Sequence, residues 1–280
     1  VLLLGSSRVL LEKGLSESLA GRFEDIRMSH WSYQEMHECF GFTLDQYIYY
    51  GGYPGAATLI SDSDRFAQYI QSSIIEATIN KDILMDTPIS KPALLKQTFE
   101  LGAAYSGNLL SLNKMLGSLQ DAGNTSTLAG YVNLLNESGL LCGLQKYSVD
   151  MSRRRASIPK FQVYNNALKM VYTPLSFEQA IVDRKAWGHI FESAVGAYLL
   201  SQAFVHRFEV YYWRERNDEV DFILRKNGAI VAIEVKSNAE KQTEGLEKFK
   251  QMFNPKSAFI VGDGGISAED FFTMDIRKLF

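Results

Sequence analysis

Apolar residues form short or alternating runs at both ends of the chain and recur with helical spacing in between. The opening run VLLLGSS predicts a buried strand, and the residues after it predict a turn, a short helix and a second strand. Alternation of strands and helices is typical of an α/β domain. We therefore expect residues 1–60 to be the last units of such a domain. Since the chain lacks an initiator Met, we also expect it to be a fragment of a longer protein.

Helical spacing continues through SYQEMHECF and TLDQYIYY, and the turn-forming cluster GGYPG at residues 51–55 interrupts it. Apolar residues at helical spacing then predict a helix from about Asp64 to Leu84. The segment DTPISKP follows that helix and has the composition of a connection. We interpret residues 61–91 as a helical linker.

Residues 92–172 show the pattern of helices followed by a hairpin. Two amphipathic stretches surround a tight turn, and the segments LLCGLQKYS and KFQVYNN alternate on either side of the basic loop SRRRAS. A helix-turn-helix followed by a β-wing is the winged-helix arrangement. In it, residues 125–138 are the recognition helix, and Arg153, Arg154 and Arg155 reach nucleic-acid phosphates. The helix contains no Arg or Lys, which weakens readout of bases, so a packing module with a solvated wing is the alternative.

Residues 173–280 show the order helix, three strands, helix, strand. A long helix from about Arg184 to Phe204 precedes FEVYYWRE and the hairpin EVDFILRKNGAIVAIEVKSN. A helix over residues 240–253 then precedes the strand SAFIVGD. This αβββαβ order is typical of a compact α/β domain. The whole chain is thus predicted to be a multi-domain α/β protein.

Composition and charge exclude few classes of function. The 280 residues carry a formal net charge of −3, so binding of nucleic acid would have to come from local patches. Cys39 and Cys142 are far apart and lack CxxC spacing, which argues against a disulfide framework or a zinc site and fits a reducing cytoplasm. No apolar run approaches the roughly 20 residues of a membrane span. We expect a cytoplasmic protein without a membrane partner.

The Asn227-Gly228 dipeptide sets the register of the predicted hairpin. Asn-Gly between alternating apolar residues favours a two-residue type I′ turn, so Asp221 faces Glu234 and Glu219 faces Lys236. One face is therefore expected to be core and the other to present three acids and a lysine. The expected core pairs are Val220 with Val235, Phe222 with Ile233, and Leu224 with Val231.

The contact predicted between Asp221 and Glu234 is unfavourable alone, because like charges directly opposite each other destabilise a sheet. A divalent ion removes the cost, since Mg²⁺ binds one or two carboxylates together with water and phosphate oxygens. We therefore predict a Mg²⁺ or Mn²⁺ site at Asp221 and Glu234, with Lys236 orienting or activating water for phosphodiester hydrolysis. The alternative is a solvated face on which Glu219 pairs with Lys236 and the like charges are tolerated.

The stretch EVDFIL…IVAIEVKSN resembles the signature of the PD-(D/E)XK nuclease-like, or restriction-endonuclease-like, fold. In this resemblance Asp221 is the acid and Glu234-Val235-Lys236 is the ExK element. A helix before the strands often supplies a further acid in that fold, and Glu192 in GHIFESAVGAYLL takes this place. The resemblance covers about residues 187–261. It implies that Glu192, Asp221, Glu234 and Lys236 are catalytic.

A wider resemblance covers almost the whole chain. The stretches GSSRVLLEKGLSESLAGRFEDIRM, YYGGYP, GHIFESAV and EVDF…IEVKSN resemble prokaryotic AAA-type P-loop ATPases that carry a C-terminal domain of unknown function with a PD-(D/E)XK-like fold. The family implies that Ser6 or Ser7 points toward a nucleotide phosphate and that Arg22 follows the next helix. No G-x-x-x-x-G-K-[ST] motif occurs in this sequence, so we expect ATP to bind only in a longer chain that contains the P-loop.

Three functions remain open from the sequence. The first is a metal-dependent nuclease module that acts on DNA or RNA. The second is a non-catalytic module that binds DNA or a protein partner and couples it to the ATPase, because a fold does not fix a function. The third is a structural unit for self-association, which leaves the acidic residues unexplained.

Overall fold

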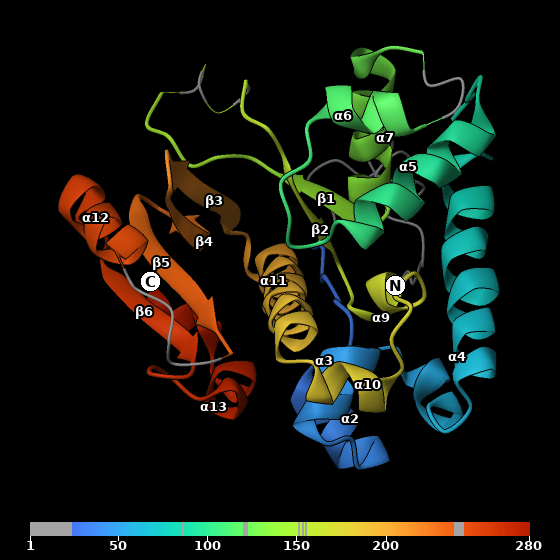
Figure 1. Cartoon of the computed structure of the whole chain (residues 1–280), viewed down its shortest axis with the longest axis horizontal. Helices are drawn as coiled ribbons and strands as arrows, with labels where there is room; N and C mark the ends of the chain where they lie inside the picture. The colour runs from blue at the N-terminus through green and yellow to red at the C-terminus, as the bar shows by residue number, and fades with distance from the viewer. Residues whose placement is uncertain are drawn as a thin grey trace.

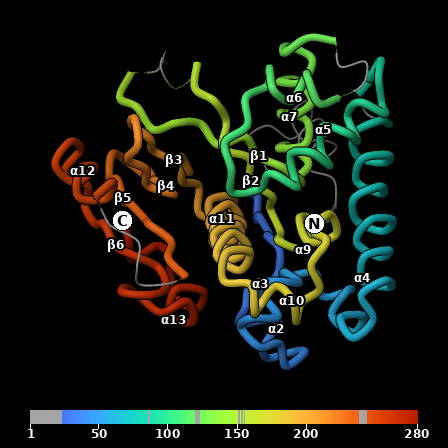
Figure 2. Tube along the Cα trace, in the orientation of Figure 1, coloured from blue at the N-terminus to red at the C-terminus, as the bar shows by residue number. Residues whose placement is uncertain are grey.

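The structure is a computed structural model, and it describes residues 24–280 except 86, 120–122, 151, 153, 155 and 238–243. Figure 1 shows mostly helical elements on one side, the C-terminal sheet on the other, and the helix α11 (Arg184–His206) between them. The Cα trace in Figure 2 has the same arrangement. The prediction of a mixed α/β protein is confirmed.

Short helices make up the first described part of the chain. Capping boxes start two of them: Ser32 exchanges hydrogen bonds with Glu35, and Thr43 does so with Gln46. The elements are α2 (Tyr33–Phe40), α3 (Leu44–Tyr50), the 3₁₀ helix η1 (Pro54–Leu59), α4 (Ser63–Tyr69), and the π-helical turns η2 (Ile70–Glu76) and η3 (Thr78–Ile83). The helix predicted near residues 64–84 is confirmed by the helical run from α4 to η3.

Helices and a small hairpin follow, in the predicted order. The helices are α5 (Pro92–Ala104), α6 (Leu112–Ser118) and α7 (Thr125–Glu137). The strands β1 (Leu141–Leu144) and β2 (Lys160–Val163) then pair antiparallel, with Leu144 opposite Lys160. Two short helices, α9 (Ala167–Met170) and α10 (Phe177–Val182), lead into α11. The winged-helix interpretation of this segment stays a prediction.

The C-terminal sheet has the order β3–β4–β5–β6. Its first three strands are antiparallel, and β6 runs parallel to β5 after the crossover through α12. The elements are β3 (Glu209–Glu215), β4 (Asp218–Lys226), β5 (Ala229–Lys236), α12 (Glu244–Phe253), β6 (Ser257–Gly262), α13 (Ala268–Thr273) and the 3₁₀ helix η4 (Ile276–Leu279). From α11 onward the chain thus follows the predicted order of helix, three strands, helix and strand.

The register of the β4–β5 hairpin agrees with the prediction near its turn. Asn227 and Gly228 both have positive φ, of 49° and 85°, as a type I′ turn requires. The paired positions run from Lys226 with Ala229 to Phe222 with Ile233.

A β-bulge in β4 changes which face of the sheet each side chain lies on beyond Phe222, so the prediction for that part of the strand is wrong. Tyr211 of β3 lies opposite Ile223, but Trp213 lies opposite Val220, so β4 contains one extra residue. Val220 and Ile223 consequently share one face of the sheet, while Phe222 lies on the other. The predicted core pair of Val220 with Val235 is wrong, because these residues pack in different clusters.

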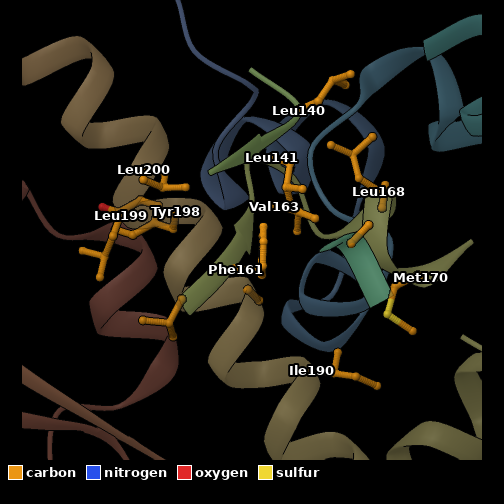
Figure 3. Close-up of a cluster of buried hydrophobic side chains, with 14 of the residues drawn as sticks. Leu140, Leu141, Phe161, Val163, Leu168, Met170, Ile190, Tyr198, Leu199 and Leu200 are labelled. Carbon is orange, nitrogen blue, oxygen red and sulfur yellow. The ribbon is translucent and has the colours of Figure 1, made fainter. Parts of the chain in front are cut away.

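Both faces of the sheet are buried, so the expectation of one core face and one polar face is also wrong. On one face Ile223 and Ala232 pack with Leu246 and Phe249 of α12. On the other face, α11 and the helical elements join a larger cluster that extends from Tyr33 to Ile276. Figure 3 shows the part of this cluster in which side chains of α11 and β2 meet. The domain boundaries placed at residues 60, 91 and 172 stay predictions.

At 23 residues, α11 is the longest regular helix of the described chain. Gly196 gives it a close approach to the strands, because a Cβ at this position would overlap the side chains of Gln162 and Phe222. The space is taken by the Gln162 amide, which donates hydrogen bonds to the carbonyls of Ser193 and Val163 at 2.8 and 3.0 Å. Within the described residues, α11 and the other helices all fall short of the length and apolarity that crossing a membrane requires.

We expect Gly196→Ala to lower the free energy of unfolding by about 1–3 kcal/mol, because the added methyl group overpacks the contact between α11 and β2. Gly130→Ala is the matched control: Gly130 lies in α7 with open space around its Cβ position, so alanine should stabilise by roughly 0.5–1 kcal/mol. Urea denaturation of both variants measures the difference. Equal stabilities for the two variants would contradict the close approach of α11.

Candidate functional site

The strands β4 and β5 separate where the candidate acids lie. β5 continues its parallel pairing with β6 as far as Lys236 opposite Gly262. On the other side of β5, the acceptor is a side chain and not the β4 backbone. The Val235 N–H donates a hydrogen bond to Asp221 Oδ2 at 2.8 Å. The sequence predicted that Asp221 and Glu234 form a facing pair in the ladder. In the structure, the Asp221 carboxylate instead accepts a hydrogen bond from the backbone N–H of Val235, the residue after Glu234.

The β-bulge explains the direction of the Asp221 side chain. Bulges re-aim side chains and are frequent beside active sites. Asp221 Oδ1 lies 3.5 Å from Nζ of Lys160, and that ammonium group lies 4.8 Å from the centre of the Phe222 ring, on the face covered by α11. The extra residue in β4 thus brings Asp221 toward α11 rather than toward α12.

Lys160, at the start of β2, occupies the centre of this arrangement. Its ammonium group lies 2.6 Å from Glu192 Oε1 of α11 as well as 3.5 Å from Asp221 Oδ1, and only 6% of the residue is exposed. Burial acts to lower the pKa of Lys160, but the charges of Glu192 and Asp221 outweigh it and raise that pKa above its ordinary value. Lys160 is therefore a buried, charged partner of both acids.

The two predicted metal ligands are carboxyls that resist ionisation. Burial raises the pKa of Asp221 to about 6, with a further contribution from the charge of Glu192. Burial also raises the pKa of Glu234 to about 8, and the charge of Asp221 adds to the effect. Both directions follow from a negative charge held away from water beside another negative charge. The structure thus brings Asp221 and Glu234 close together, as the sequence predicted.

Lys236 completes the group on the β5 side. It lies two residues after Glu234, so the two side chains leave the strand on the same side, and Lys236 is only 3% exposed. Glu234 Oε2 is buried and has no hydrogen-bond partner within the described residues. A buried acceptor without a donor is costly and is free to bind a cation.

Glu219 lies at the exposed rim of the group. It sits opposite Arg214 in the β3–β4 ladder, and the two side chains form a loose ion pair at 3.8 Å. With 59% of its side chain exposed, Glu219 contributes only modestly to the raised pKa of Glu234.

The residues predicted to meet nucleic acid or nucleotide are mostly outside the described residues. Ser6, Arg22, Arg153 and Arg155 all lie there. Arg154 is described, and its guanidinium group lies over the rings of Tyr147 and Tyr211, at 5.6 and 5.3 Å from their centres. Arg154 therefore packs against Tyr211 of β3 in the C-terminal sheet.

Lys160 is a site residue that the sequence did not predict. The residue begins an alternating segment, KFQVYNN, that predicts an ordinary strand. Its partner Asp221 is 61 positions further along the chain, and only the packing of β2 against α11 and β4 brings them together. Only the structure marks the position, as a lysine in a strand whose four residues are all buried.

Two family models match the chain, and the candidate site lies where they meet. Residues 41–179 match a domain of unknown function, DUF8612, and residues 187–271 match another, DUF4143. Lys160 belongs to the first region, whereas Glu192, Asp221, Glu234 and Lys236 belong to the second. The C-terminal segment is therefore similar to a domain of unknown function, in agreement with that part of the predicted resemblance.

The chain is also similar to uncharacterized bacterial proteins. Proteins of Mycobacterium tuberculosis and Mycobacterium bovis are each 24% identical over 236 residues, which cover 84% of this chain and 52% of theirs. A protein of Haemophilus influenzae is 23% identical over 279 residues, which cover 94% of this chain and 65% of its own length. The chain thus spans about half to two thirds of the length of these relatives. No solved structure gives a significant match.

The raised pKa of Glu234 predicts a loss of stability with rising pH in protein freed of metal by a chelator. Between its ordinary value of 4.5 and about 8, the folded chain holds the Glu234 proton more tightly than the unfolded chain does. The free energy of unfolding should therefore fall by roughly 1–3 kcal/mol as the pH rises from 5 to 8. Glu234→Gln, which cannot titrate, should flatten this dependence in urea denaturation at several pH values. Parallel curves for the variant and the wild type would contradict the raised pKa.

Proposed function

We propose that the C-terminal α/β part of this chain is a metal-dependent nuclease module that hydrolyses phosphodiester bonds in nucleic acid. The observation that carries the proposal is the pair of carboxyls, Asp221 buried and Glu234 half-buried, with raised pKa values beside the buried Lys236. Strongly shifted pKa values in a group of adjacent side chains are typical of functional sites. The order of elements around them, which resembles that of restriction endonucleases, supports the same function.

The residues present fit a small divalent cation. Asp221 and Glu234 supply carboxylate oxygens, the donors that Mg²⁺ and Mn²⁺ prefer, and the buried Oε2 of Glu234 is free to serve as one. Within the described residues, no group of three or more His, Cys, Asp or Glu side chains could hold a metal. An ion here would thus take two side-chain ligands, with water and phosphate oxygens as the rest. When bound, it would offset charge on a phosphate and lower the pKa of a nearby water.

The side chains of the chain itself have distinct roles in this proposal. The Lys236 ammonium group donates hydrogen bonds that orient the attacking water or a phosphate oxygen. The Val235 N–H holds the Asp221 carboxylate in place through its 2.8 Å hydrogen bond. Glu192 acts on the site through Lys160, to which it is bound. The reaction adds one water across a P–O bond and yields a phosphomonoester and a sugar hydroxyl.

We further propose that the natural protein carries an AAA-type ATPase part before these residues, and that ATP binds there, with Ser6 and Arg22 near its phosphates. The relatives are longer than this chain, which leaves room for such a part. The nuclease module would then act under the control of ATP binding elsewhere in the protein.

A second candidate function is a non-catalytic module that binds DNA or a protein partner. The observation that favours it is the low exposure of the site: Asp221 is 9% exposed and already has a positive partner in Lys160. A phosphodiester must reach the reacting groups for cleavage, whereas a binding module has no such requirement.

Incubation of the chain with supercoiled and single-stranded DNA in Mg²⁺ or Mn²⁺ separates the two functions. We expect nicking that falls by about 100-fold or more in Asp221→Asn and in Lys236→Met, because each removes a group from the reacting site. Asp218→Asn is the matched control, since Asp218 lies in the same strand but pairs with Lys248 at 2.7 Å. Nicking that persists in both site variants would contradict the proposal, and DNA binding without cleavage would support the second function.

A further inference from the structure

Lys160 is the buried cation of the site, and in the nuclease proposal it has no role of its own beyond binding Glu192. It comes from β2, in the region that matches DUF8612, and it reaches the acids of the region that matches DUF4143. We propose that Lys160 is a built-in cation that competes with the divalent ion for Asp221, so that β2 controls loading of the site. This inference rests on the proposed metal-binding function.

The distances around Asp221 show why the ammonium group of Lys160 and a divalent ion compete for it. The Lys160 ammonium group lies 3.5 Å from Asp221 Oδ1 and 3.4 Å from the Asp221 carbonyl oxygen. A divalent ion bound to that carboxylate sits at about 2.0–2.6 Å from an oxygen. Bound through Oδ1, the two positive charges would lie no more than about 6 Å apart, in an interior where screening is weak. The ammonium group and the divalent ion therefore weaken each other's binding to the Asp221 carboxylate.

Glu192 gives Lys160 a second position. The Glu192 carboxylate is the nearer partner, at 2.6 Å, and its side chain is 18% exposed. Because the lysine stem is long and flexible, the ammonium group can leave Asp221 and keep Glu192 without any unfolding of β2. Glu192 then acts as a positioning residue that retains the displaced lysine, and not as a metal ligand.

The same contact couples two parts of the chain. Lys160 pairs with Leu144 in the β1–β2 hairpin and forms an isolated bridge with Leu109. A shift of this hairpin moves the ammonium group relative to Asp221, which β4 carries. Loading of the site is therefore linked to the position of the hairpin, and by reciprocity a bound ion biases that position.

Titration of the 280-residue chain with Mn²⁺ by isothermal calorimetry tests the competition. We expect the dissociation constant to fall by about 10-fold in Lys160→Met, a change within the usual range of coupling between two sites. Lys248→Met is the control, since Lys248 of α12 pairs with Asp218 at 2.7 Å and with neither Glu192 nor Asp221. It should bind Mn²⁺ like the wild type. Lys160→Gln, which keeps a polar group in place, serves if the methionine variant does not fold.

The outcomes distinguish this inference from the function on which it rests. Equal affinity of the wild type and both Lys160 variants would overturn the competition and leave the metal site intact. Mn²⁺ binding that is absent from every variant, or unchanged in Asp221→Asn, would overturn the metal site itself. In the double variant Lys160→Met/Asp221→Asn, the gain in affinity should disappear, because the shared ligand is gone.

Discussion

The ammonium group of Lys160 lies between the carboxylates of Glu192 and Asp221, in an interior formed by β2, α11 and β4. Charges are costly to remove from water and are tolerated inside a protein only when they are paired and hydrogen-bonded. These three come from three separate elements, so the chain can bury them only when those elements meet. The location of the candidate site depends on this contact as much as on the strands that carry the acids.

The local features of the hairpin could be predicted because they depend on neighbouring residues. Asn227-Gly228 fixes the turn, and the turn fixes the pairs from Lys226 with Ala229 to Phe222 with Ile233. The proximity of Asp221 and Glu234 followed from that register, and the two residues are also close in the structure. There, however, a hydrogen bond from the Val235 N–H to the Asp221 side chain replaces the backbone pairing.

The rest could not be predicted, because it depends on contacts between distant segments. The bulge in β4 arises where β3 and β4 pair out of step, and no residue of β4 alone signals it. The second core, in which Val220 and Ile223 meet Phe249 of α12, needs the position of a helix that follows the hairpin. The position of Lys160 depends in turn on the packing of β2 against α11.

The proposed site for a divalent cation consists of Asp221 and Glu234. A crystal structure of the protein with saturating Mn²⁺, with the ion located by its anomalous scattering, tests it most directly. We predict a peak at about 2.0–2.6 Å from a carboxylate oxygen of each residue, with the Lys160 ammonium group withdrawn from Asp221 and still bound to Glu192. An ammonium group that remains on Asp221, with no anomalous peak between the two carboxylates, would contradict the account.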